Sequence, residues 1–271
     1  MIAILLAAAT PGPIATLPGG DKARFEACVA LTRSDPDHAL AQADQWASRA
    51  RTVPARECLG LALVAAGRWA AAAMAFDQAA TGAEADRDGR AATLWTQAGN
   101  AALAANDPER ARTYLDRALA IPALTPVMQG EAWYDRARAD VAVGDLPLAR
   151  IDLDKGLKLA GEDPFGWLLS AALARRQNDL ARAATDIQKA AELAPDDASV
   201  ALEAGNIAAA SGAPKAAAIA WAKAAQLAPD EPEGKAAAQA LANGAAPADG
   251  PNPLDYSLTF PAGAKPGAAK K

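Results

Sequence analysis

Few side chains in this sequence could carry chemistry. His38 is the only histidine, and it follows Asp35-Pro36-Asp37, a pattern typical of the first turn of a helix, where a histidine is usually exposed. One histidine and two cysteines are too few ligands for a structural zinc site. The sequence contains no GxGxxG, GxxxxGK[ST], HExxH or GxSxG motif. We therefore expect no catalytic residues, no metal ion and no cofactor.

Adjacent carboxylates occur as Glu162-Asp163 and as Asp196-Asp197. Each pair stands at a turn between predicted helices, where capping of the next helix is a sufficient explanation. An enzyme with an unrecognised site is the alternative from another functional class. A deep polar pocket with convergent titratable groups would favour that alternative.

Composition restricts both the fold and the partners. Of 271 residues, 52% are hydrophobic but only 5% are aromatic, so the core must consist mainly of Ala and Leu on closely packed helices. The net charge of -5 argues against general binding of nucleic acid or anionic membranes.

The sequence repeats with a period of about 34 residues. The clearest pair is Ala190–Asp197 with Ala224–Asp230, and Trp133 and Trp167 have the same spacing. One position of each unit favours the left-handed conformation that ends a helix, and it is occupied by Gly67, Asn106, Gly144, Asn178 and Gly212. Acidic residues typical of helix N-caps follow in three units, at Asp107, Asp145 and Asp179. Each unit is therefore predicted to be helix, tight turn, helix.

Fixed small and large residues predict how the two helices of a hairpin touch. A small residue recurs on the first helix, at Gly60, Gly99, Ala137, Ala171 and Gly205. A larger apolar residue recurs on the second helix, four places after a fixed alanine, at Phe76, Leu115, Leu153, Ile187 and Trp221. With the alanines around it, this residue forms an apolar stripe that we interpret as core.

These positions resemble the tetratricopeptide repeat. The resemblance is carried by Trp95, Ala98, Gly99, Ala111, Leu115 and Ala118, and again by Trp167, Ala183, Ile187, Ala190 and Pro195. It implies an all-α fold, an α-solenoid in which helix-turn-helix hairpins stack into a right-handed superhelix. One position that is aromatic in the family departs from the pattern, with Leu63, Ala102, Asp140, Ala174 and Ala208 in this chain.

We divide the chain accordingly. The solenoid is predicted over 21–243, with a degenerate unit near 22–50, units starting near 53, 92, 130, 164 and 198, and a capping helix over 231–243. Residues 244–271, rich in Pro, Ala, Gly and Lys, are predicted to be a disordered tail.

Residues 1–20 are interpreted as a signal peptide or as a flexible N-terminus. An apolar run over 1–9 precedes Thr10-Pro11-Gly12-Pro13, as in the apolar and cleavage regions of an export signal, but no Lys or Arg precedes the run. The run is too short to span a bilayer. We expect a periplasmic or otherwise exported protein, with a cytoplasmic one as the alternative.

Cys28 and Cys58 lie on the first helices of two successive predicted hairpins. If the protein is exported, a disulfide between them would stabilise the fold by roughly 3 kcal/mol and hold the degenerate first unit in place. The alternative is two buried thiols that behave as small apolar side chains.

The resemblance also implies a binding surface. In the family, the first helices of the hairpins line the concave side of the superhelix. The polar and aromatic residues carried over to those positions are Thr96, Asn100, Glu131, Tyr134, Arg138, Phe165, Arg175, Arg176 and Asn206. The arginines are expected to meet a carboxylate of a partner, with Tyr134 and Phe165 supplying apolar contact. The carboxylate clamp of the family is only half matched, because its lysines are absent.

The sequence therefore predicts a non-catalytic scaffold that binds a partner peptide or protein in this concave groove. The alternative within the same class is a cytosolic adaptor or regulatory subunit.

Overall fold

The computed structural model describes residues 20–244, which contain thirteen α-helices. Their bounds are α1 Asp21–Ser34, α2 Pro36–Ala50, α3 Val53–Ala65, α4 Trp69–Ala85, α5 Ala91–Ala104, α6 Pro108–Ala120, α7 Pro126–Val143, α8 Leu146–Leu159, α9 Pro164–Arg176, α10 Leu180–Leu193, α11 Ala198–Ala210, α12 Pro214–Leu227 and α13 Pro232–Asn243. The predicted signal peptide and most of the predicted tail lie outside the described residues. The third predicted unit begins at Pro126 rather than near residue 130, because Thr125 caps α7 through the backbone N–H of Met128.

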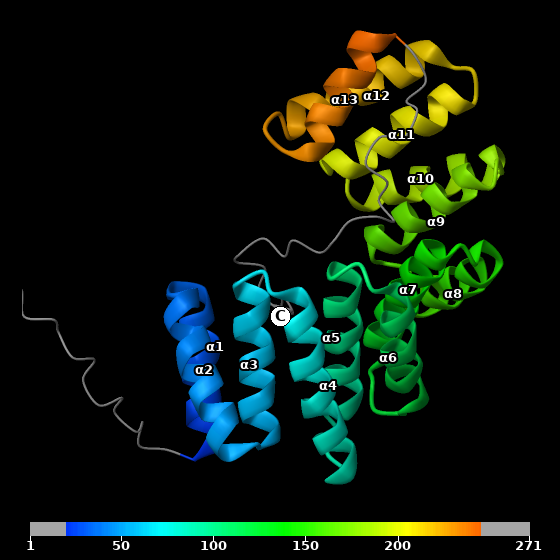
Figure 1. Cartoon of the computed structure of the whole chain (residues 1–271). Helices are drawn as coiled ribbons and strands as arrows, with labels where there is room; N and C mark the ends of the chain where they lie inside the picture. Colours follow the sequence, from blue (N-terminus) through cyan, green and yellow to red (C-terminus); the bar gives the residue numbers. More distant parts are fainter. Residues whose placement is uncertain (1–19, 245–271) are drawn as a thin grey trace, which may run out of the picture.

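The helices form a row of hairpins. Each helix packs against its neighbours along the chain, and successive first helices, such as α5 and α7 or α9 and α11, also touch. Figure 1 shows α1 to α5 side by side, with the later helices turned progressively away from that direction. This arrangement is the predicted α-solenoid, in which each hairpin buries its apolar face against the next.

The turns within the hairpins have the predicted backbone. All five predicted positions have positive φ: Gly67 68°, Asn106 58°, Gly144 88°, Asn178 60° and Gly212 74°. The predicted caps also form, since the carboxylates of Asp107, Asp145 and Asp179 accept hydrogen bonds from backbone N–H groups three residues later. Local chemistry thus ends one helix and begins the next within two or three residues.

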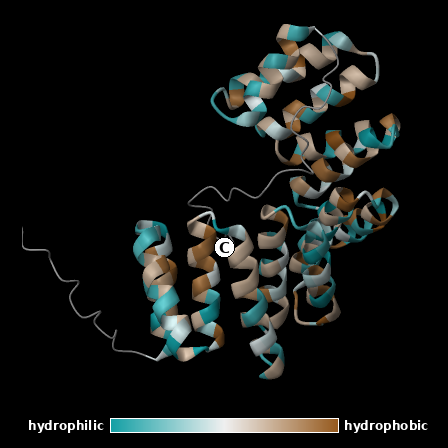
Figure 2. Ribbon diagram, viewed as in Figure 1, coloured by the Kyte–Doolittle hydropathy of each residue, from teal (hydrophilic) through white to brown (hydrophobic). Residues whose placement is uncertain are grey.

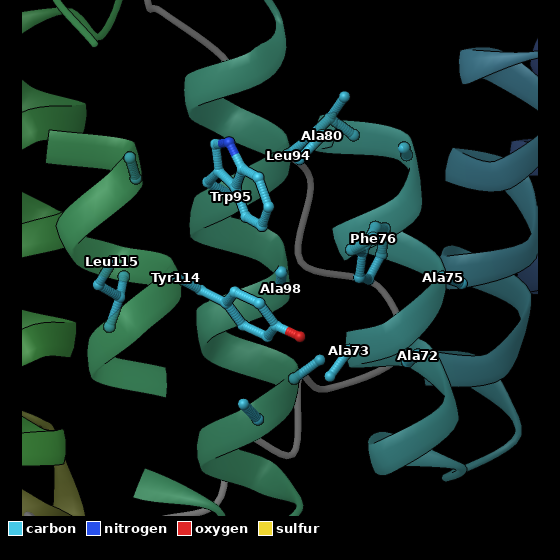
Figure 3. Packing of buried hydrophobic residues seen from close by; sticks show 14 of the residues in the cluster. Ala72, Ala73, Ala75, Phe76, Ala80, Leu94, Trp95, Ala98, Tyr114 and Leu115 are labelled. Carbon is cyan, nitrogen blue, oxygen red and sulfur yellow. The ribbon is translucent and has the colours of Figure 1, made fainter. Parts of the chain in front are cut away.

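The core pairs a small residue with a large one inside each hairpin. A Cβ atom at Gly60 would lie 2.5 Å from Cε1 of Phe76, and one at Gly99 would lie 2.6 Å from Cγ of Leu115. The predicted contact between these positions is therefore confirmed. Figure 3 shows Phe76 on α4, Trp95 on α5 and Leu115 on α6, with alanines of α4 and α5 between them.

Hydrophilic residues interrupt the apolar ones along the helices (Figure 2). Over residues 20–244, no helix is both long and apolar enough to cross a membrane.

Candidate functional site

The nine residues predicted to bind a partner lie on the first helices α5, α7, α9 and α11. Six of them remain accessible to solvent: Thr96, Asn100, Phe165 and Arg175 are half-buried, whereas Glu131 and Arg176 are exposed. The Thr96 hydroxyl donates to the Ala92 carbonyl of its own helix. Because α5, α7 and α9 touch in succession, these six side chains belong to one continuous row of helices.

A charged cluster occupies the middle of this row, at α7. Arg138 donates from Nη1 to Oδ1 of Asp135 over 3.2 Å, and its guanidinium lies 6.0 Å from the centre of the Phe165 ring. The side-chain amide of Asn100 also bonds the Asp135 carboxylate. Burial raises the pKa of Asp135, and Arg138 and Asn100 oppose that effect. The structure thus brings Asn100 and Arg138 together around Asp135, a carboxylate outside the predicted set, and Phe165 lies beside Arg138.

The structure corrects the expectation that Arg138 is exposed, because only 2% of its surface is accessible. Its charge is engaged within the chain, by Asp135 among others. A buried guanidinium that already holds a carboxylate positions its neighbours more readily than it recruits a new partner.

Tyr134 is also a correction, since it belongs to the core. It is 1% exposed, and its hydroxyl donates to the carbonyl of Ala160 over 2.9 Å. The ring lies directly against Gly156 and Gly166, where any side chain would collide with it. Burial is the main cause that raises its pKa. The side chain ties α7 to α8 and α9 and leaves no surface for a partner.

Arg175 and Asn206 are joined through a buried carboxylate rather than free to bind. Arg175 donates from Nε to Oε1 of Glu203 over 2.6 Å, and Glu203 is 0% exposed. Asn206 donates to Glu203 over 3.1 Å and accepts from Nε1 of Trp221 over 3.1 Å. The predicted role of Asn206 in the groove is therefore wrong, because its polar groups serve the contact between α11 and α12.

A second charge network lies between α6, α7 and α8 and was not predicted. Arg136 of α7 donates to Asp116 of α6 and to Asp152 of α8, each over 2.6 Å. Arg112 of α6 pairs with the fully buried Asp140 of α7 over 2.9 Å. Burial first, and then the nearby Asp152 carboxylate, raise the pKa of Asp140 to about 7, against the opposing guanidinium groups. The sequence signal was Asp140 itself, a charge at a position that is apolar in the other units.

Cys28 and Cys58 form a disulfide in the structure, with their Cα atoms 6.1 Å apart. The bond joins α1 to α3, so it crosses from the first hairpin to the second. Both residues lie in an apolar cluster with Ala39, Ala43 and Ala62.

His38 is exposed, and one of its ring nitrogens lies 2.9 Å from the amide nitrogen of Gln42. Over the described part of the chain, no group of three or more His, Cys, Asp or Glu side chains is placed to hold a metal ion.

Comparison with solved structures identifies proteins that have a similar architecture. The chain is similar to PilW, described as a widely conserved type IV pilus biogenesis factor, with a TM-score of 0.67, 20% identity, and coverage of 79% of this chain and 96% of that chain. It is similar to PilF of Pseudomonas aeruginosa, with a TM-score of 0.63, 16% identity, and coverage of 79% and 95%. It is also similar to YrrB, described as a TPR protein with an unusual peptide-binding site, with a TM-score of 0.51, 19% identity, and coverage of 72% and 96%.

No protein-family model and no curated protein matches the sequence. At these identities the likeness concerns the fold, and it agrees with the repeat pattern, the turns and the hairpin contacts described above. The chain therefore has the tetratricopeptide-repeat fold.

Proposed function

We propose that the protein is a non-catalytic scaffold that binds a peptide or protein segment along the first helices α5, α7 and α9. The observation that carries this proposal is the row of accessible polar and aromatic side chains on these touching helices. Repeat proteins use such extended surfaces for binding because each unit adds a few contacts to a long interface.

Two accessible residues of α9 define the chemistry of the partner. Phe165 and Arg176 are eleven residues apart, which is about three helical turns, so they lie on the same side of α9. Arg176 is exposed and has no ion-pair partner among residues 20–244. A partner segment with an apolar residue near Phe165 and a carboxylate near Arg176 would satisfy both.

We propose further that the protein is exported. The support is the disulfide between Cys28 and Cys58, because such bonds persist in oxidising compartments and are rare in the cytosol. The apolar run at the N-terminus, which lies outside the described residues, is consistent with this proposal.

A photo-crosslinking experiment tests the binding surface. Benzoylphenylalanine would replace Phe165 in cells that produce the protein, and a matched chain would carry it in place of Ile219, which is 73% exposed on the second helix α12. We expect a covalent partner from position 165 that position 219 does not capture. Mass spectrometry then identifies the partner.

The second part of the test measures the affinity of variants for that partner. Arg176→Glu should weaken binding by about 1–3 kcal/mol, because it replaces a charge-assisted contact by repulsion. Lys189→Glu, which reverses a charge on the second helix α10, is the matched control. Crosslinks from position 219 alone, or equal losses in both variants, would place the binding surface on the second helices and contradict the proposal.

A further inference from the structure

A groove of about 540 Å³ lies between α2 and α4, with α3 beneath it. We call it the α2–α4 groove. Its two walls belong to second helices of hairpins, so it is separate from the row of first helices considered above. The wall from α4 presents Ala71, Met74, Ala75 and Gln78. The wall from α2 presents Asp37, Leu40, Ala41 and Asp44, and the floor is formed by Leu59 and Leu63 of α3.

Each wall is a straight stripe of helical residues. On both helices the lining residues follow an i, i+3, i+4, i+7 pattern, which covers about two turns of one face. α2 and α4 are both second helices, and they run in the same direction with α3 between them. Three helices arranged in this way leave a groove that a fourth helix can occupy, as in helix-in-groove recognition.

The next three grooves between successive second helices, which we call valleys, are occupied by side chains of the chain itself. Between α4 and α6, the ring of Tyr114 stacks on Trp95, with ring centres 5.5 Å apart. Between α6 and α8, Arg136 of α7 donates hydrogen bonds to Asp116 of α6 and to Asp152 of α8. Between α8 and α10, Arg182 donates to Asp154 over 2.5 Å.

The α2–α4 groove has no such closure. Its floor positions carry Leu59 and Leu63, where the unit of α7 carries Arg136 and Asp140. No ion pair joins α2 to α4 within residues 20–244. Met74 is 52% exposed on the α4 wall, and a methionine adapts its shape to different apolar partners. The first valley is therefore apolar and open, whereas side chains occupy the next three.

The charges at the rim indicate what the occupant carries. Asp37 and Asp44 are exposed and have no ion-pair partner in the described part of the chain. They are seven positions apart, so they lie about 10 Å apart along one face of α2. Arg68, also exposed, stands at the end of the groove beside the start of α4. The C-terminal end of a helix, with its partial negative charge, suits the position of Arg68.

We propose that the α2–α4 groove binds a basic amphipathic helix of a partner protein. The apolar face of that helix covers Leu59, Leu63 and Met74. Two Lys or Arg residues seven positions apart pair with Asp37 and Asp44, and the C-terminal end of the helix lies near Arg68.

The test uses a synthetic probe and the full chain. The probe is a labelled fourteen-residue helical peptide with Leu along one face and two Lys residues seven positions apart beside that face. A second peptide has Glu in place of both Lys residues, and a third has the composition of the first in scrambled order. Binding is followed by fluorescence anisotropy at low and at moderate salt, since the charge pairs weaken as salt rises.

We expect the Lys peptide to bind and the scrambled peptide not to bind. Met74→Lys should weaken the Lys peptide about tenfold or more, because it removes an apolar contact and adds repulsion. Ile219→Lys makes the same kind of change at an exposed site on α12 and should leave the affinity unchanged. Circular dichroism of each variant checks that the fold is retained.

The decisive variant is the double substitution Asp37→Lys and Asp44→Lys, which should reverse the preference so that the Glu peptide binds better than the Lys peptide. Equal binding of the scrambled peptide, or no effect of Met74→Lys and of the double substitution, would overturn the proposal. A dimer in sedimentation experiments that Met74→Lys abolishes would instead assign the groove to a second copy of the chain, and that result would also overturn it.

Discussion

Asp140 stands where the other units carry Leu63, Ala102, Ala174 and Ala208, and it is fully buried. Its pKa rises from 3.8 to about 7, mainly because burial disfavours the charged form. As the pH increases, the unfolded chain therefore releases this proton before the folded chain does. The contribution of Asp140 to stability is largest below pH 4 and is lost between about pH 4 and pH 7.

We predict that Asp140→Asn removes this dependence on pH. The variant should be more stable than the original chain at pH 8, and its free energy of unfolding should change less between pH 5 and pH 8, where one such group contributes up to ~1.4 kcal/mol per pH unit. Urea denaturation at several pH values measures both effects. Asp196→Asn, at an exposed turn, is the control, and parallel pH profiles for the original chain and Asp140→Asn would show that Asp140 is already ionised in the folded state.

Buried carboxylates also bind two of the predicted site arginines, so these arginines are less available to a partner. Arg138 serves Asp135, and Arg175 serves Glu203, so removing both arginines would leave two buried carboxylates with fewer partners. Such a double substitution would disturb the fold, and it cannot separate binding from stability. Arg176 is the better probe, since it is exposed.

At the scale of elements, seven of the thirteen described helices are capped by the side chain of the residue that precedes them. Asp197 caps α11, because its Oδ1 atom accepts from the backbone N–H groups of Ser199 over 2.7 Å and Val200 over 3.0 Å. Its neighbour Asp196 makes only a distant contact, with Nζ of Lys223 at 4.0 Å. Two adjacent aspartates thus have different roles.

We predict that Asp197→Ala lowers the free energy of unfolding by about 1 kcal/mol, because α11 loses the acceptor for its first N–H groups. Asp196→Ala, the matched control, should change it by less than about 0.5 kcal/mol. Chemical denaturation measures both. Equal effects of the two substitutions would show that net charge, and not capping, controls the stability of this turn.

At the scale of the whole molecule, each hairpin depends on its neighbours, and within residues 20–244 the first hairpin has a neighbour on one side only. α1 and α2 contact α3, and the disulfide from Cys28 to Cys58 adds a covalent link across that boundary. The cross-link closes a segment of 30 residues. It therefore restricts the unfolded chain and holds the end of the solenoid in place.

We predict that replacing both cysteines by Ser costs roughly 3–4 kcal/mol of stability, from the loop-closure entropy of that segment. Native-state hydrogen exchange should show the loss concentrated in α1 and α2, since α11 and α12 lie at the other end of the solenoid. Alkylation of unreduced native protein, followed by mass measurement, should find no free thiol. Two alkylated cysteines in that material would contradict both the disulfide and the argument for export.

The repeat register, the hairpins and their turns could be predicted from the sequence by itself, because they depend on contacts within one unit. A turn at Asn106 or Gly144 needs only a residue that accepts positive φ, and the contact of Gly99 with Leu115 joins helices adjacent in the chain. Local backbone preferences and a regular apolar pattern are enough to specify such features.

The tertiary structure alone decided which side chains remain available for binding. Arg175 meets Glu203 twenty-eight residues later, and Arg136 meets Asp116 twenty residues earlier, so each pairing depends on how helices of neighbouring units are placed. The family pattern assigns Tyr134 to the binding surface, but the approach of Gly156 and Gly166 buries it. The tertiary structure also decided that the α2–α4 groove is open. Its apolar floor is distinctive only by comparison with the next valleys, which charged side chains and aromatic rings occupy. Burial and charge pairing are set by packing between units, and the sequence of one unit does not contain that information.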